Sequence, residues 1–213
     1  MKIIKWYLYA LMIVALAAFS ASAQDTNKVE FFGGYSLLSV DTGLDEFDAD
    51  LFDSRENIHG FNGSITGNVS RRIGLKFDFS THSKELFNDS FTQVKARNNQ
   101  FLGGVQFKNN EKDGPVFKPF GHVLAGVSNQ RLSCEGDCFV GEGVITSFTE
   151  TQNNFAMVFG GGLDIKVHPR IDIRAFQIDY NPIFFRANED STNFFTDSRT
   201  QNNFRIGVGI VIH

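Results

Sequence analysis

The stretch Gly74–Ser83 reads GLKFDFSTHS, and it decides the fold class because apolar and polar side chains alternate along it. Its large apolar residues, Leu75, Phe77 and Phe79, occupy every second position, and polar or charged residues stand between them. A period of two is typical of a β-strand with one apolar face, whereas an amphipathic helix repeats every 3.6 residues. The stretch therefore predicts a strand with one apolar and one charged face.

The same alternation recurs on both sides of this stretch and predicts an all-β domain of eight strands. The expected strands are Val29–Val40, Ile58–Arg71, Gly74–Ser83, Val94–Lys108, Val116–Ser128, Asn154–Val167, Ile171–Arg186 and Thr200–His213. In the seventh strand the alternation slips at Ala175 and Phe176, which predicts a β-bulge. With no internal repeat or linker, residues 24–213 are expected to form one domain.

The connections between these strands alternate in length. Three are short, namely Arg72–Ile73, Asn109–Pro115 and His168–Arg170. Four are longer and polar, namely Asp41–Asn57, Lys84–Gln93, Asn129–Asn153 and Ala187–Arg199. This layout predicts an antiparallel up-and-down transmembrane barrel, with tight turns on the periplasmic side and long loops outside. An even number of strands then puts both chain ends on the periplasmic side.

The polar face of the strands distinguishes a membrane barrel from a soluble one, because alternation alone fits both. This face carries acids, bases and many glycines. Small residues leave room for long charged side chains in a narrow interior, where charges need partners across the lumen. The expected lumen charge network consists of Glu30, Lys76, Asp78, Asp164, Lys166, Arg174 and Arg205. Lys118 and Asp172 fall on the same face of their strands.

The N-terminal segment Met1–Ala23 has the three parts of a secretory signal peptide. Lys2 and Lys5 precede an apolar run, and Ala21–Ala23 forms a small-residue cleavage site. We expect cleavage before Gln24. The alternative, a membrane anchor, is disfavoured because the apolar run is short for a bilayer span.

Composition excludes two broad classes of protein. The mean hydropathy of −0.15 excludes a bundle of transmembrane helices, whereas a barrel exposes only every second strand residue to lipid. The net charge of −4 gives no reason to expect nucleic acid as a partner.

Cys134 and Cys138 lie in the third long connection, and an exported protein meets an oxidising compartment. We expect a disulfide that ties the loop tip. A metal site that uses both thiolates with Glu135 and Asp137 is the alternative, but no histidine is close in sequence to complete it. No cofactor and no metal are expected.

The remaining polar residues give little sign of chemistry. The acidic segment Asp41–Glu56 is expected to be a solvated loop, and the alternative is that it gathers divalent cations beside lipopolysaccharide. None of the five histidines stands in a local nucleophile motif, and His122 is expected to face a carboxylate in the lumen. A Ser-His-Asp set assembled from loops stays open as an alternative.

Four motifs together carry a resemblance to a known family. They are FFGGYS at Phe31–Ser36, TGNV at Thr66–Val69, GGGLD at Gly160–Asp164 and RIGVGIVI at Arg205–Ile212. In this order and spacing they resemble the eight-stranded outer-membrane β-barrels related to OmpA and OmpX. The resemblance implies that the last strand is the signal read by the barrel assembly machinery. Family members usually end on an aromatic residue, and this chain ends on His213.

The leading hypothesis is a non-enzymatic protein of the bacterial outer membrane whose external loops contribute to envelope integrity or surface interaction. Its expected partners are outer-membrane lipids, lipopolysaccharide and the barrel assembly machinery, and the sequence identifies no extracellular partner. Two alternatives stay open at this point, a narrow channel for small solutes and a soluble periplasmic ligand-binding barrel.

Overall fold

The chain folds into a closed antiparallel β-barrel in which each strand pairs with the next and the last pairs with the first. The computed structural model describes residues 26–41, 55–88, 92–140, 143–185 and 200–213. The strands are β1 (Val29–Asp41), β2 (Arg55–Asn68), β3 (Ile73–Asn88), β4 (Thr92–Lys108), β5 (Phe117–Val140), β6 (Gly143–His168), β7 (Ile171–Phe184) and β8 (Thr200–Ile212). The fold class and the strand number predicted from the sequence are confirmed. In the described part of the chain, no helix is long and apolar enough to cross a membrane.

The barrel is apolar outside and polar inside. On β3, the Phe77 side chain is 71% exposed, whereas its neighbour Lys76 is 1% exposed. Outward-facing phenylalanine, isoleucine and valine recur on every strand. A soluble ligand-binding barrel has the opposite distribution, with apolar side chains inside. The outer surface therefore suits contact with lipid and does not fit the soluble alternative.

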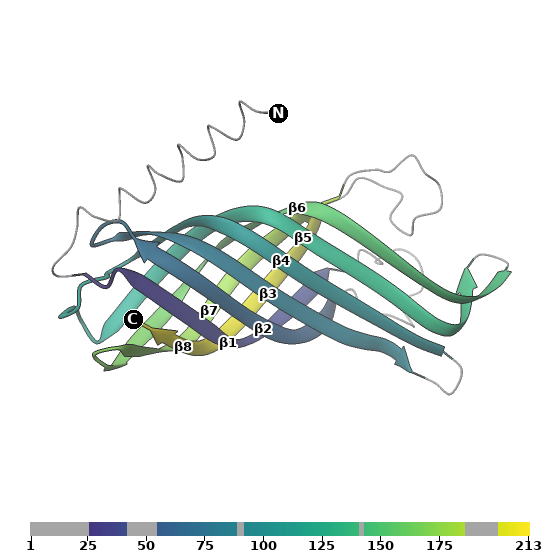
Figure 1. The fold of residues 1–213 in the computed structure, drawn as a ribbon, viewed down its shortest axis with the longest axis horizontal. Coiled ribbons are helices and arrows are strands. Elements are labelled where there is room, and N and C mark those ends of the chain that lie inside the picture. The colour runs from purple at the N-terminus through teal and green to yellow at the C-terminus, as the bar shows by residue number, and fades with distance from the viewer. Residues whose placement is uncertain (1–25, 42–54, 89–91, 141–142, 186–199) are drawn as a thin grey trace, which may run out of the picture.

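The two ends of the barrel differ. The short connections after β2, β4 and β6 lie at one end, beside the C-terminus (Figure 1). The connections at the other end include residues 42–54 and 186–199, which are outside the described residues. The expected signal peptide Met1–Ala23 and most of the acidic segment Asp41–Glu56 are outside them as well.

The prediction of a long loop at Asn129–Asn153 is wrong, because most of this segment is strand. β5 and β6 stay paired from Phe117↔Ile165 to Val140↔Gly143 and extend far beyond β7, whereas β4 follows β5 as far as Thr92↔Gly136 (Figure 1). The expected loop Lys84–Gln93 is also largely strand, in β3 and β4. Outside the membrane both faces of a sheet meet water, so the alternation that marks a strand fades while the backbone ladder continues.

The bulge expected in the seventh strand is confirmed. The register between β7 and β8 shifts between Arg174 and Gln177, and both Ala175 and Phe176 face outward. After this shift the odd-numbered residues of β7 point inward, beginning with Gln177.

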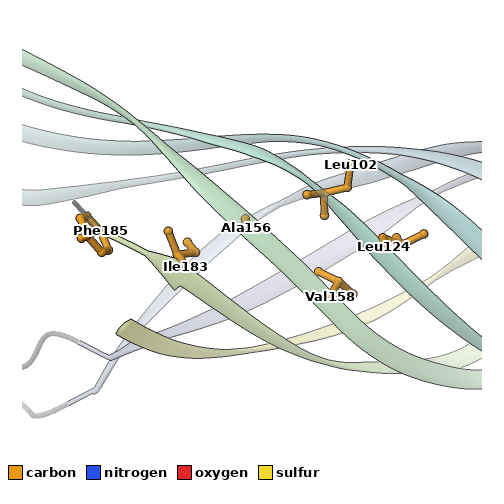
Figure 2. Packing of buried hydrophobic residues seen from close by; sticks show 6 residues of the cluster. All are labelled: Leu102, Leu124, Ala156, Val158, Ile183 and Phe185. Carbon is orange, nitrogen blue, oxygen red and sulfur yellow. The ribbon is translucent and has the colours of Figure 1, made fainter. Parts of the chain in front are cut away.

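Part of the lumen is apolar. Figure 2 shows this buried cluster, which consists of Leu102, Leu124, Ala156, Val158, Ile183 and Phe185. Along β4, Leu102 lies farther from the short turns than the buried Gln106 and Lys108. The charged part of the lumen is therefore nearer the end with the short turns.

Candidate functional site: a charge network in the barrel lumen

Among the residues that the structure describes, the lumen holds five buried carboxylates and five buried lysine or arginine side chains, each at most 3% exposed. The acids are Glu30, Asp78, Asp164, Asp172 and Asp179, and the bases are Lys76, Lys108, Lys118, Arg174 and Arg205. Isolated charges in such a place would each cost several kcal/mol, so this balance requires pairing across the interior.

Lys108 links strands that are not neighbours in the barrel. Its Nζ is 2.5 Å from Oε2 of Glu30 on β1 and 3.1 Å from Oδ2 of Asp164 on β6, while Lys108 itself belongs to β4. Asp164 also accepts hydrogen bonds from Nε and Nη2 of Arg174, at 2.8 and 3.1 Å. These contacts cross the lumen near the short turns.

Arg174 is held between two buried aromatic rings. Its guanidinium carbon is 4.2 Å from the ring centroid of Phe32 and 4.1 Å from that of Phe120. Glycines make room for both rings, because a Cβ at Gly162 would be 2.9 Å from the Phe120 Cζ, and one at Gly209 would be 2.7 Å from the Phe32 Cε2. A guanidinium over an aromatic face is stabilised by the ring quadrupole, most strongly where water is excluded.

The chain terminus takes part in the network. His213 places Nε2 2.8 Å from Oδ2 of Asp172 and Nδ1 3.5 Å from Oε1 of Glu30. Lys118 Nζ lies 2.9 Å from the same Asp172 oxygen. The residue that departs from the family pattern thus contributes to the lumen.

Arg205 is the centre of the second half of the network. Its Nη1 is 2.9 Å from Oδ1 of Asp78 on β3, and its Nη2 is 2.7 Å from Oδ2 of Asp179 on β7. His122 places Nε2 2.9 Å from Oδ1 of Asp179. Gln177 joins the two halves, since it accepts from Arg174 at 2.8 Å and donates to Asp179 at 2.6 Å.

Six of the seven residues expected in the network lie in the lumen, and Lys166 does not. Lys166 is half-buried at the rim, and its Nζ donates to the backbone oxygen of Lys112 at 2.6 Å. The β6–β7 register shifts between Lys166 and His168, where the barrel ends. A long lysine side chain at a rim keeps its ammonium group towards water.

Among the buried acids, lysines and arginines of the network, the sequence analysis did not identify Lys108 and Asp179. The alternation of inward and outward residues could have identified both of them. Lys108 continues the inward series of Gln106 on β4, and Asp179 falls on the inward side once the bulge in β7 is counted.

Hydrogen bonds continue across the lumen towards the other end. Gln100 donates to Asn181 at 2.7 Å, from β4 to β7, and Gln130 donates to Gln201 at 3.1 Å, from β5 to β8. Side chains therefore bridge the interior at several heights.

A contact between Ser36 and His82 is the feature closest to a catalytic pair. Ser36 Oγ and His82 Nε2 are 3.0 Å apart, but Ser36 is fully buried. Within the described residues, Nδ1 of His82 has no hydrogen-bond partner, so no acid orients the ring as a triad requires.

Cys134 and Cys138 form a disulfide within β5. The β5–β6 register shifts between Glu135 and Cys138, and Gly136 between them has a φ of 99°, which favours glycine. The bridge closes this irregular segment and does not join strands.

Reduction of this bridge is expected to leave the barrel folded, lowering its stability by at most about 2 kcal/mol, because the bridge closes a short segment outside the lumen network. The measurement is the fraction of heat-modifiable folded protein on gels, with and without dithiothreitol. The double variant Cys134→Ser/Cys138→Ser is the matched control. Loss of the folded band on reduction would contradict this view.

Comparison with known proteins gives one sequence match and several similar folds. Residues 8–211 match the model of the outer membrane protein beta-barrel domain family. No curated protein sequence matches.

Among solved structures, Neisserial surface protein A is 9% identical, with a TM-score of 0.53 over 89% of this chain and 99% of its own. The attachment invasion locus protein Ail of Yersinia pestis is 15% identical, with a TM-score of 0.48 over 86% and 97%. OprG of Pseudomonas aeruginosa is 12% identical, with a TM-score of 0.49 over 89% and 96%. At these identities the likeness concerns the fold alone.

Proposed function

The chain belongs to the outer membrane β-barrel protein family, and from this premise we propose that it is a non-enzymatic surface protein with a closed lumen. Its barrel anchors the extension of β3, β4, β5 and β6 outside the cell. The function is carried by this extension and not by a passage through the barrel.

The observation that carries this proposal is the contact of Arg205 with carboxylates from two other strands. Asp78 lies on β3 and Asp179 on β7, so the guanidinium of β8 spans the interior. Eight strands enclose a space just wide enough for side chains to fill. A lumen filled in this way supports a structural role and counts against a wide pore.

The length of the β5–β6 pair supports the surface role. These strands have 24 and 26 residues, whereas a transmembrane strand needs about 9–11. The surplus lies at the end opposite the short turns, which in this family face the periplasm. We further propose that Met1–Ala23 is removed on export and that the assembly machinery reads β8.

A shortened hairpin tests the proposal. Residues 132–150 are replaced by Asn-Gly, which retains the register pair Arg131↔Thr151. We expect the variant to fold and insert. In a deletion strain it should not correct the defect, whether this is detergent sensitivity or loss of attachment. The Cys134→Ser/Cys138→Ser variant, which retains the hairpin, is expected to correct the defect. Full restoration by the shortened variant would assign the function to the barrel itself.

A further inference from the structure

The outward-facing residues of β3, β4, β5 and β6 form three successive rows beyond the middle of the barrel, defined by the strand register. The first row is Phe79, Phe101, Val127 and Phe155; the second is Thr81, Asn99, Asn129 and Asn153; the third is Ser83, Arg97, Arg131 and Thr151. Hydrogen bonds tie the second row together, at 2.8 Å between Thr81 and Asn99 and 2.7 Å between Asn129 and Asn153. From the first row to the third, the side chains change from apolar to amide-bearing to cationic, which is the order expected across a boundary between lipid and water.

The third row lies at the height of lipid headgroups. Arg97 is four residues beyond Phe101 on β4, and Arg131 is four residues beyond Val127 on β5. At about 3.3 Å per residue this is roughly 13 Å along the strand, and a tilt of about 40° reduces it to about 10 Å in height. Aromatic rows of such barrels lie at the interface of lipid and water.

Arg97 and Arg131 are direct cross-strand partners on the outer face. Like charges in this position destabilise a sheet. Among the described residues neither guanidinium has an ion pair, whereas the neighbouring Lys95 has Glu85 at 3.5 Å. The two arginines line a hollow of about 480 Å³ together with Ser83, Ser133, Lys84, Lys95, Glu85 and Glu135, so its lining carries four bases and two acids. An anion between the two guanidinium groups would relieve their repulsion.

A second, apolar hollow lies farther towards the middle of the barrel, beyond the second row, and shares no lining residue with the first. It has a volume of about 620 Å³, and its lining includes Phe77, Phe79 and Phe101 around Gly63 and Gly103. Both hollows use the outer surface of β3 and β4. A soluble anion would need only the cationic hollow, whereas a lipid offers acyl chains to one hollow and phosphate to the other.

We propose that Arg97 and Arg131 bind the headgroup phosphate of an outer-leaflet lipid whose acyl chain packs in the hollow at Gly63 and Gly103. Paired guanidinium groups match phosphate oxygens in geometry and charge. The site rests on the orientation given in the proposed function, with β5 and β6 extending outside. It does not depend on whether the lumen conducts or on what the hairpin contacts.

The test compares the double variant Arg97→Gln/Arg131→Gln with Arg72→Gln, which removes an exposed arginine at the end with the short turns. In non-ionic maltoside detergent the double variant is expected to melt at the same temperature as the wild type or higher, because a repulsion is removed. In nanodiscs containing lipopolysaccharide it is expected to melt lower than the wild type and to retain about tenfold less lipid by native mass spectrometry. Arg72→Gln should match the wild type in both. Equal lipid retention by the double variant and the wild type would overturn the proposal.

Two further arms identify the ligand. Gly103→Leu fills the apolar hollow at ordinary contact distance, since a Cβ there would be 3.6 Å from the Phe77 ring, so we expect a folded barrel with reduced lipid retention. Inorganic phosphate in maltoside is expected to leave the melting temperature of the wild type unchanged. If inorganic phosphate stabilised the wild type as much as lipopolysaccharide does, the site would belong to a soluble anion and the lipid assignment would fail. None of these measurements depends on the hairpin phenotype, so the two proposals can fail separately.

Discussion

Replacement of Arg205 by alanine is expected to destabilise the barrel by about 3–5 kcal/mol, because it removes the cation that two buried carboxylates share. Asp78 and Asp179 both lie within 2.9 Å of the guanidinium, and neither is more than 3% exposed. The free energy of unfolding is measured by urea titration in detergent, with the folded and unfolded forms separated on gels.

The control is Arg72→Ala, in which an exposed arginine is removed from a turn and a change within about 0.5 kcal/mol is expected. Adding Asp78→Asn to the Arg205 variant should recover part of the loss, since it removes one of the two carboxylates that lost the guanidinium. A loss below about 1 kcal/mol for Arg205→Ala would mean that water solvates the lumen and that the ion pairs contribute little.

Placing a charge on the outer wall is expected to have the second largest effect. Leu75 is 37% exposed on the apolar outer surface and lies four residues from Phe79, whose row is at the interface, and arginine at the bilayer midplane costs about 2–4 kcal/mol in such barrels. We therefore expect Leu75→Arg to lower the free energy of unfolding by that amount in lipid vesicles.

Thr149→Arg is the matched control, because Thr149 faces outward on β6 beyond the apolar rows. It should change stability by less than about 0.5 kcal/mol. Equal effects of the two substitutions would contradict the assignment of the outer wall to lipid.

The membrane-spanning strands could be predicted from the sequence because successive residues face lipid and the charged lumen in turn. The first position requires an apolar side chain, and the second requires a polar or small one. Gly74–Ser83 shows both demands within ten residues, and its alternation matches the burial found in β3. The slip at Ala175 and Phe176 also identified the bulge in β7.

The extension beyond the membrane could not be read in the same way. From Asn129 to Asn153 apolar and polar residues no longer alternate regularly, so the sequence looks like a loop although the backbone ladder continues. Strand pairing depends on backbone hydrogen bonds, which leave no mark in side-chain composition.

The members of the lumen network were largely predictable, but their pairs were not. Alternation places Arg205 and Asp78 inside, yet their contact joins β8 to β3, two strands that are not neighbours. Which inward residues meet depends on the register and on glycines such as Gly160, where a Cβ would collide with the Asp179 carboxylate.

The conductance of the wild-type protein in planar lipid bilayers tests the closed lumen most directly. With the ion pairs of Arg205, Lys108 and Arg174 in place, we expect no steady current, and Arg205→Ala should add only small, flickering openings. Large and steady channels from the folded wild-type protein would contradict the closed lumen and make the narrow solute channel the better account.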